Sequence, residues 1–356
     1  MAMHGNKGEW SETYAFLRLL ADGKLFAADE QLNRIENMFF PILKIIREGI
    51  NGTQYEYHLD SKASKVKIFL NDKQVLCLPT SIFDEEAKHL IGKIVAGKTS
   101  FKVTKTESFI KTIFITKLKA PTTDKSDINI QIHDVTTGYK NVVGFSIKSE
   151  LGSAPTLLNA GKTTNFIYEV NGLDLSKIAQ INAISTPTKL IDRMKAIAYE
   201  GGRLIFAGME NEKFKNNLIM IDSQMPIIVA EFLLGYYTKG ISDCADLTDY
   251  ISQVNPLSCN NEFYNHKIKD MLCAIALGMK PATVWDGTDE ASGGYIIVKT
   301  NGDVLAYHIY NRDAFRSYLL RNTKLEKGSS SRHDFCKLYE KDGKVQIKLN
   351  LQIRFI

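Results

Sequence analysis

The sequence predicts a mixed α/β protein in which two strand-rich regions enclose a long helical stretch. Residues 127–170 contain segments that alternate apolar and polar side chains, as half-buried strands do. Residues 186–280 instead repeat apolar side chains at the spacing of amphipathic helices. Strand patterns return after residue 281, where a hairpin is built on Asn301-Gly302. These three observations favour a mixed sheet flanked by helices, with a helical insertion and C-terminal hairpins.

The N-terminal part begins with a predicted helix over residues 9–21, which Asp22-Gly23 ends. A second helical pattern covers residues 30–48, and Pro41 inside it is expected to kink or split the helix. The other elements predicted before residue 114 are strands within 54–78 with a turn at Asn71-Asp72, and helices at 81–96 and 104–113.

The C-terminal part is predicted to contain one helix, 312–321, before a last hairpin within 335–355. The change from strand to helix patterns near residues 180–186 predicts a boundary between two regions, 1–180 and 181–356. The sequence has no Pro-, Gly- or Ser-rich linker at this place, so the boundary rests on the change of pattern alone.

Composition excludes several classes of protein. The chain has 356 residues, a net charge of +5 and 44% hydrophobic residues, which is ordinary for a globular protein. Its five cysteines are widely spread without a CxxC pair, so a disulfide framework and a zinc ribbon are not expected. The N-terminus is polar, and the apolar stretch 226–235 is short and contains Glu231. We therefore expect a cytoplasmic protein with no membrane partner. The mild positive charge permits a nucleic-acid partner without requiring one.

Two strands in the central region carry the chemistry. The odd-numbered residues of 127–133 are polar and the even-numbered ones are isoleucines, so Asp127 and the isoleucines point to opposite faces. On the partner strand, Ser146 and Lys148 share one face, while Phe145 and Ile147 share the other. A turn centred near 137–138 would place Asp127 roughly opposite Lys148.

An aspartate and a lysine that converge in this way suit metal-assisted phosphodiester hydrolysis. A carboxylate binds a hard cation such as Mg²⁺ through oxygen, and the cation lowers the pKa of bound water. A lysine orients or deprotonates that water and stabilises the developing negative charge. The alternative reading of the spacing is a structural Asp–Lys ion pair at the end of a strand.

The pattern of Asp127, Ser146 and Lys148 resembles the signature of the PD-(D/E)xK nucleases, with serine in place of the second acid. KGEWSE (7–12), followed by Gly23, resembles the first core helix of that fold, and Glu12 matches its metal-facing glutamate. More closely, the chain resembles the HpaII-type restriction endonucleases. The segments that carry this resemblance are KGEWSE, GFSIKSELGS (144–153), TLLNAG (156–161), TNFIYE (164–169), SSSRHDF (329–335) and KLNLQIRF (348–355).

The resemblance implies a type II restriction enzyme that makes Mg²⁺-dependent double-strand breaks at a short unmethylated site in duplex DNA. The founding member of the family reads CCGG. A cognate methyltransferase would act on the same site without forming a required complex. A palindromic site favours a two-fold dimer, while a monomer that nicks each strand in turn is the alternative. The rival functions are a junction or repair nuclease of the same fold and a DNA-binding protein that has lost catalysis.

The resemblance also implies a role for each catalytic residue. Asp127 binds the metal, Lys148 positions the water, and Ser146 occupies the degenerate acid position. A hydroxyl is a poorer metal ligand than a carboxylate. Either one hydrated Mg²⁺ suffices, with the Ile147 carbonyl as a further ligand, or Glu12 or Glu150 contributes.

Two polar loops are the candidate DNA contacts. The first follows Lys148, and the second is a basic, hydroxyl-rich loop that joins the helix near 312–321 to the last hairpin. Arg332 is the first candidate for a base contact, because arginine to guanine is the commonest specific contact. The candidates are Ser149, Ser153, Thr156, Asn159, Lys162 and Asn165 in the first loop, and Lys327, Ser329, Ser330, Ser331, Arg332 and His333 in the second.

Overall fold

The computed structural model describes residues 3–49, 52–118, 126–135, 138–308 and 311–356. The chain forms two compact units, and each takes residues from two separate stretches of sequence. Unit 1 comprises Met1–Pro155 and Asp289–Phe315, and unit 2 comprises Thr156–Thr288 and Arg316–Ile356. The regions predicted from sequence, 1–180 and 181–356, divide the chain at another place. The division of function between those two regions stays a prediction.

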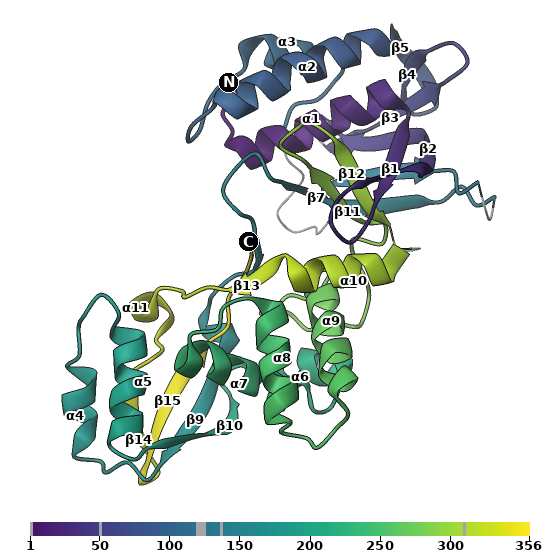
Figure 1. The fold of residues 1–356 in the computed structure, drawn as a ribbon. Coiled ribbons are helices and arrows are strands. Elements are labelled where there is room, and N and C mark those ends of the chain that lie inside the picture. Colours follow the sequence, from purple (N-terminus) through teal and green to yellow (C-terminus); the bar gives the residue numbers. More distant parts are fainter. Residues whose placement is uncertain (1–2, 50–51, 119–125, 136–137, 309–310) are drawn as a thin grey trace. The chain divides into compact units, whose positions relative to one another are not determined.

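A mixed sheet forms the centre of unit 1 (Figure 1). Its strands are β1 (Lys24–Ala28), β2 (Arg34–Glu48), β3 (Gln54–Asp60), β4 (Lys65–Leu70), β5 (Lys73–Pro79), β6 (Ile128–Ile132), β7 (Val142–Ser149), β11 (Gly294–Val298) and β12 (Val304–His308). Their order is β1-β12-β11-β7-β6-β2-β3-β4-β5, and β1 also pairs with β2. The first six strands of this order therefore close into a ring, in which β1–β12 and β11–β7 are parallel pairs.

Three helices accompany this sheet: α1 (Lys7–Asp22), α2 (Thr80–Ala96) and α3 (Thr104–Thr112). Helix α1 begins with a capping box, because Asn6 accepts the N–H of Glu9 while Glu9 accepts the N–H of Asn6. It ends at Gly23, which adopts the left-handed conformation that glycine tolerates best. Helices α1 and α2 pack side by side (Figure 1). Trp10, Phe16 and Leu17 of α1 are fully buried, so this helix is anchored in the core of unit 1.

The helix predicted over residues 30–48 is wrong, because most of this segment is strand β2. Apolar residues are so frequent in it that its pattern fits a helical period as well as a strand. The pairing partners decide the outcome: β2 pairs with β1, β3 and β6. Pro41 does not break the strand, since the β2–β6 register shifts between Ile42 and Lys44 and the carbonyl of Pro41 accepts the N–H of His133.

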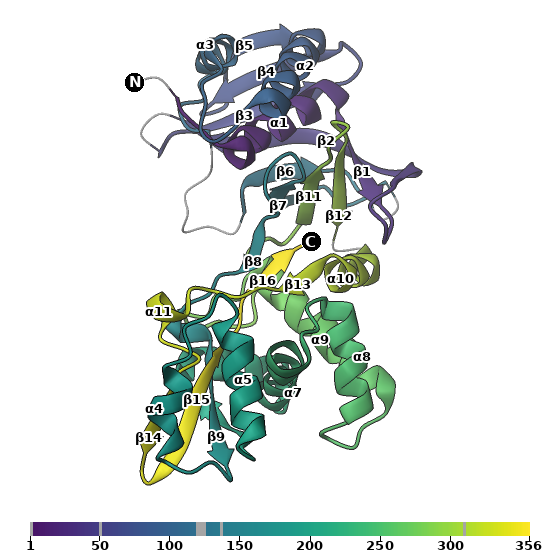
Figure 2. The same ribbon diagram turned by 60° about the vertical axis from the view of Figure 1, so that its left-hand side comes forward.

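Unit 2 combines short sheets with helices (Figure 2). One sheet has the order β10-β9-β15-β14 and another has the order β13-β16-β8. The strands are β8 (Thr156–Leu158), β9 (Asn165–Asn171), β10 (Arg203–Met209), β13 (Thr323–Leu325), β14 (Leu338–Lys341), β15 (Lys344–Asn350) and β16 (Ile353–Phe355). The helices are η2 (Lys162–Thr164), α4 (Lys177–Asn182), α5 (Lys189–Tyr199), α6 (Glu212–Ile221), α7 (Met225–Leu234), η3 (Gly235–Lys239), α8 (Cys244–Val254), α9 (Asn261–Leu277) and α11 (Ser330–His333). A further helix, α10 (Arg312–Arg321), begins in unit 1 and ends in unit 2.

The helical stretch predicted over 186–280 is confirmed, except that it also contains the strand β10. The turn at Asn71-Asp72 is confirmed as well, and both residues have positive φ, as a tight hairpin requires. The apolar stretch 226–235 lies mainly in the buried helix α7. Across the described residues, no single helix is long and apolar enough to cross a membrane; only the sharply bent pair Glu212–Ile221 and Met225–Lys239 meets that test together.

Candidate active site

The hairpin of β6 and β7 places Asp127 beside Ser146, not opposite Lys148. The pairs Ile128↔Phe145 and Asn129↔Gly144 fix the register, and its continuation brings Asp127 to Ser146. The sequence reading misplaced the register. Part of the predicted turn centre, residue 137, lies outside the described residues. The described residues on either side pair two residues away from the expected register, with the N–H of Asp134 bonded to the carbonyl of Tyr139.

The Asp127 carboxylate is held by its neighbours on β7. Its Oδ2 accepts the backbone N–H of Ile147 at 2.7 Å and the hydroxyl of Ser146 at 3.1 Å. The N–H of Asp127 in turn donates to the carbonyl of Phe145. Ser146 is 3% exposed. The serine that replaces the expected acid therefore donates a hydrogen bond that orients the remaining acid.

Lys148 follows Ile147 near the end of β7. Its Nζ lies 5.4 Å from the centroid of the Tyr295 ring, and β11, which carries Tyr295, pairs with β7. Burial lowers the pKa of the Lys148 ammonium, and the carboxylates of Asp127 and Glu12 oppose this shift. A lysine in such surroundings gives up its proton more readily than one in water, which suits a group that handles the attacking water.

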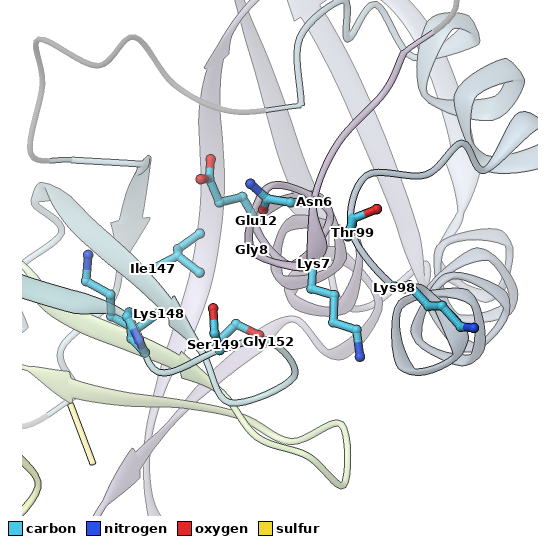
Figure 3. Close-up of a pocket in the computed structure, with 12 residues that line it drawn as sticks. Asn6, Lys7, Gly8, Glu12, Lys98, Thr99, Ile147, Lys148, Ser149 and Gly152 are labelled. Atoms are coloured by element: carbon cyan, nitrogen blue, oxygen red, sulfur yellow. The ribbon is translucent and has the colours of Figure 1, made fainter. Parts of the chain in front are cut away.

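Glu12 and Lys148 line one cavity of about 490 Å³ in unit 1. Figure 3 shows them approaching from α1 and β7, with Ile147 between them. The structure therefore brings together Glu12 and Lys148, two candidate catalytic residues that the sequence analysis drew from separate segments. The complete lining is Asn6, Lys7, Gly8, Glu12, Lys98, Thr99, Ile147, Lys148, Ser149, Gly152, Ser153 and Pro155.

A pair of serines ties α1 to the end of β7. The hydroxyl oxygens of Ser11 and Ser149 are 2.8 Å apart. Ser11 donates its hydrogen to the carbonyl of Lys7, so Ser149 is the donor between the two hydroxyls. Ser149 also accepts the N–H of Leu151. Since these serines adjoin Glu12 and Lys148 in sequence, their contact sets the separation of the two site residues.

The sequence analysis missed the basic rim of this cavity, which comprises Lys7 and Lys98. Lys7 donates to the carbonyl of Val95, near the C-terminal end of α2. Lys98 follows that same helix, and both lysines extend away from the Glu12 carboxylate in Figure 3. Lys7 belongs to the motif KGEWSE, so its segment was recognised from the sequence. Lys98 lies in a loop after a predicted helix, and no motif marks that loop. Only packing of α1 against α2 brings these lysines to one cavity.

The oxygen donors at the site suit Mg²⁺. They are the carboxylates of Asp127 and Glu12 and the backbone carbonyl of Ile147, and Mg²⁺ binds through one or two carboxylates while it keeps several waters. No cluster of three or more His, Cys, Asp or Glu residues able to hold a metal occurs in the described part of the chain. Glu150, considered as a further ligand, instead accepts the N–H of Thr300 through its carboxylate.

The predicted DNA-contact residues fall into two places. Ser149 and Ser153 line the cavity of unit 1. The others belong to unit 2, where the two predicted loops lie against each other: a Cβ built on Gly328 would come within 2.6 Å of the Ala160 side chain. The exposed ones on the two loops are Asn159, Lys162, Lys327, Ser329, Ser331 and Arg332, while Thr156, Ser330 and His333 are partly exposed.

Two buried asparagines join these loops. The Nδ2 of Asn350 donates to the carbonyl of Gly161, to Oγ1 of Thr164 and to Oδ1 of Asn165. The Nδ2 of Asn165 donates to the carbonyl of His333 and to the carboxylate of Glu210. Asn165 is completely buried. Its polar groups therefore serve protein partners, and the structure gives it a role in fixing the loops where the sequence analysis expected a DNA contact.

A cavity lined by Glu12, Lys148 and a basic rim, with Asp127 bonded to the N–H of the lining residue Ile147, holds the kinds of group that a phosphodiester-cleaving nuclease uses. Residues 6–355 match the family described as HpaII restriction endonuclease. The chain is 42% identical over 358 residues to "Type II restriction enzyme HpaII" of Haemophilus parainfluenzae, covering 99% of this chain and 98% of that protein. The chain belongs to the HpaII restriction endonuclease family and is a type II restriction enzyme, a site-specific deoxyribonuclease that binds DNA. No solved structure matches it.

Proposed function

We propose that the cavity between α1 and the end of β7 is the site at which this restriction enzyme cuts DNA. The observation that carries the proposal is the convergence of Glu12, Ile147 and Lys148 on one cavity, with Asp127 bonded to the N–H of Ile147. We further propose that α1, β6 and β7 belong to a core of the PD-(D/E)xK type. The resemblance of the pattern Asp127, Ser146 and Lys148 supports this assignment.

Asp127, Glu12 and the carbonyl of Ile147 would hold Mg²⁺. When bound, this cation supplies an activated water and neutralises charge on the scissile phosphate. Lys148 orients that water and is poised by its lowered pKa to take a proton from it. Ser146 keeps the Asp127 carboxylate in place through its 3.1 Å hydrogen bond.

Lys7 and Lys98 contact the phosphates next to the scissile bond, because two ammonium groups at the rim of the cavity attract the DNA backbone. The paired loops of unit 2 supply contacts for recognition, with Arg332 aimed at a guanine. The similarity to HpaII supports CCGG as the recognition sequence, with a cognate methyltransferase that protects the same site without a required complex. The enzyme acts in the cytoplasm, as a two-fold dimer or as a monomer that nicks each strand in turn.

Digestion of unmethylated plasmid with Mg²⁺, followed by sequencing of the ends, tests the proposal. The wild type is expected to give discrete fragments with ends at CCGG, while Asp127→Ala and Lys148→Ala give none. A Lys148→Ala protein that cuts at the wild-type rate would overturn the assignment of the active site. Ends at another sequence would overturn the specificity and leave the site intact.

The assignment of Arg332 has its own test. Arg332→Ala is expected to weaken binding to the specific duplex by roughly 1–3 kcal/mol and to relax the preference at one base pair. Lys341→Ala is the control, because Lys341 is an exposed cation at the end of β14 outside the two loops. Unchanged affinity and specificity in the Arg332 variant would remove it from the recognition surface.

A further inference from the structure

Arg47 near the end of β2 is a cation that interacts with the acids of the proposed active site, although no motif in the sequence marks it. Its Nη2 donates to the backbone carbonyls of Lys117 at 3.1 Å and Leu118 at 2.8 Å. The guanidinium also lies over the Phe16 ring, 5.2 Å from its centroid. These contacts hold the side chain in one place, so its positive charge has a fixed position in unit 1.

Two structural relationships put this charge next to the acids of the site. Phe16 follows Glu12 by one helical turn on α1, and residues four apart lie on the same face of a helix. On the other side, β2 pairs with β6 through Ile46↔Asn129, close to where Asp127 precedes β6. The carboxylates of both Glu12 and Asp127 act on the guanidinium: burial lowers the pKa of Arg47, and the charges of Tyr57, Glu12 and Asp127 oppose the shift.

Burial also lowers the pKa of Lys148, and the same two carboxylates, Asp127 and Glu12, oppose this shift. The site therefore combines two carboxylates with two cations, one on β7 and one on β2. An arginine remains protonated even when it is buried, so it supplies a permanent charge that lysine does not.

We propose that Arg47 is a positioning residue that balances the charge of Glu12 and Asp127 before the metal binds. Arg47 sets one permanent positive charge against the two carboxylates, so a DNA phosphate that enters the metal-free site meets an acid pair whose charge is already partly compensated. Arg47 also competes with a cation for the carboxylates, so it limits how tightly Mg²⁺ is held. The inference rests on the proposed active site and adds to it a residue on another strand.

This role predicts two effects of opposite direction. Without the Arg47 charge, the DNA-free protein should bind Mg²⁺ more tightly, and the metal-free protein should bind DNA more weakly. Each change should be at least roughly tenfold, since a unit charge even about 10 Å away shifts an affinity by that much through an effective dielectric constant of about 20. A purely structural role would weaken both, because a distorted site holds neither ligand.

The experiment compares Arg47→Gln, Arg47→Met and Arg47→Lys with the wild type. Calorimetric titration of the full-length, DNA-free protein with Mg²⁺ gives the metal affinity, and fluorescence anisotropy of a CCGG duplex in EDTA gives the metal-free DNA affinity. Arg47→Gln keeps a donor for the Leu118 carbonyl without the charge, so it is expected to show both effects even where Arg47→Met fails to fold. Arg47→Lys keeps the charge and is expected to stay near the wild type in both measurements.

Arg18→Met is the matched control, because it removes the same charge from unit 1 at a place where Arg18 pairs with Asp22 and Asp84. It is expected to leave both affinities near the wild-type values. If the Arg47→Gln variant weakens both the Mg²⁺ affinity and the metal-free DNA affinity, or changes neither of them, the inference is overturned. If Asp127→Ala keeps the Mg²⁺ affinity of the wild type, the proposed active site fails, whatever Arg47 does.

Discussion

The hydroxyls of Ser11 on α1 and Ser149 on β7 are 2.8 Å apart, in a hydrogen bond between residues that directly precede Glu12 and follow Lys148. The helix carries Glu12 and the strand carries Lys148, so this bond joins the two elements on which the proposed active site is built. A short side chain on each element allows the close approach.

Removal of this contact should reduce catalysis more than DNA binding. Ser11→Ala and Ser149→Ala are each expected to lower kcat several-fold with little change in KM, because the separation of Glu12 and Lys148 is set by the contact. Each should also lower the free energy of unfolding by about 1 kcal/mol. Steady-state cleavage and denaturant unfolding measure these quantities. Ser108→Ala, which removes a helical hydroxyl bonded to the Thr104 carbonyl in α3, is the control. Equal loss of kcat in the control would contradict the prediction.

Asp127→Asn and Asp127→Ala should differ in stability but not in activity. Both remove the charge that would hold the proposed metal, and cleavage is expected to fall at least roughly a hundredfold in each. Asparagine keeps an oxygen that accepts the N–H of Ile147, whereas alanine leaves that group without its partner. Alanine should therefore cost about 1–3 kcal/mol of unfolding free energy relative to asparagine. Identical stabilities would show that the hydrogen bond to Ile147 does not hold the hairpin.

Ser146→Asp should make the stability of unit 1 depend on Mg²⁺. Ser146 is buried 3.1 Å from Asp127, so an acid at this position adds a second negative charge beside the first. In EDTA the melting temperature is expected to fall below that of the wild type, and Mg²⁺ should raise it by more than in the wild type. Thermal unfolding followed by circular dichroism compares the two conditions. If Mg²⁺ raised the melting temperature of the variant no more than that of the wild type, a metal at Asp127 would be contradicted.

Asn350→Ala should loosen the two loops of unit 2 together. The side chain is 2% exposed and bonds to the Gly161 carbonyl and to Asn165, so its loss leaves buried polar groups unsatisfied. We expect about 2–4 kcal/mol lower unfolding free energy and faster amide exchange in both loops. Hydrogen-exchange mass spectrometry locates the change. Asn33→Ala, at an exposed turn, is the control. Faster exchange confined to one loop would contradict the joint role of Asn350.

Lys98→Ala should weaken DNA binding without altering which sequence is preferred. A lysine at the rim of the cavity contacts phosphate in the proposed complex, so its removal should lower the slope of log affinity against log salt by roughly one. Binding to specific and unrelated duplexes at several salt concentrations gives both quantities. Lys88→Ala, whose lysine pairs with Asp84 on α2, serves for comparison. An unchanged slope would exclude Lys98 from the DNA path.

The sequence predicted those parts of the proposed site that depend on the pattern of residues within a single strand or helix. Parity along one strand separated Asp127 from the isoleucines, and a family motif marked Glu12 on a helix that has clear helical spacing. The predicted register of β6 against β7 was wrong by two residues, because the alternation of side chains within each strand does not fix how two strands pair.

The positions of Arg47, Lys98 and Tyr295 near the proposed site could not be predicted, because each depends on long-range packing. Arg47 lies in a segment whose apolar residues fit a helix as well as a strand, and strand pairing decided between them. Lys98 depends on α2 packing against α1. Tyr295 is brought to Lys148 by a parallel pairing between strands far apart in the chain.

The discontinuity of unit 1 has a consequence for the nascent enzyme. Lys148 leaves the ribosome well before β11 and β12, and the ring of strands closes only when β12 pairs with β1. Until then the surroundings of Lys148 are incomplete, since Tyr295, whose ring centroid lies 5.4 Å from its Nζ, has not been synthesised. A nuclease built in this order gains its cutting ability only after most of the polypeptide is finished. Incomplete chains released early are therefore expected to leave the cell's own DNA intact.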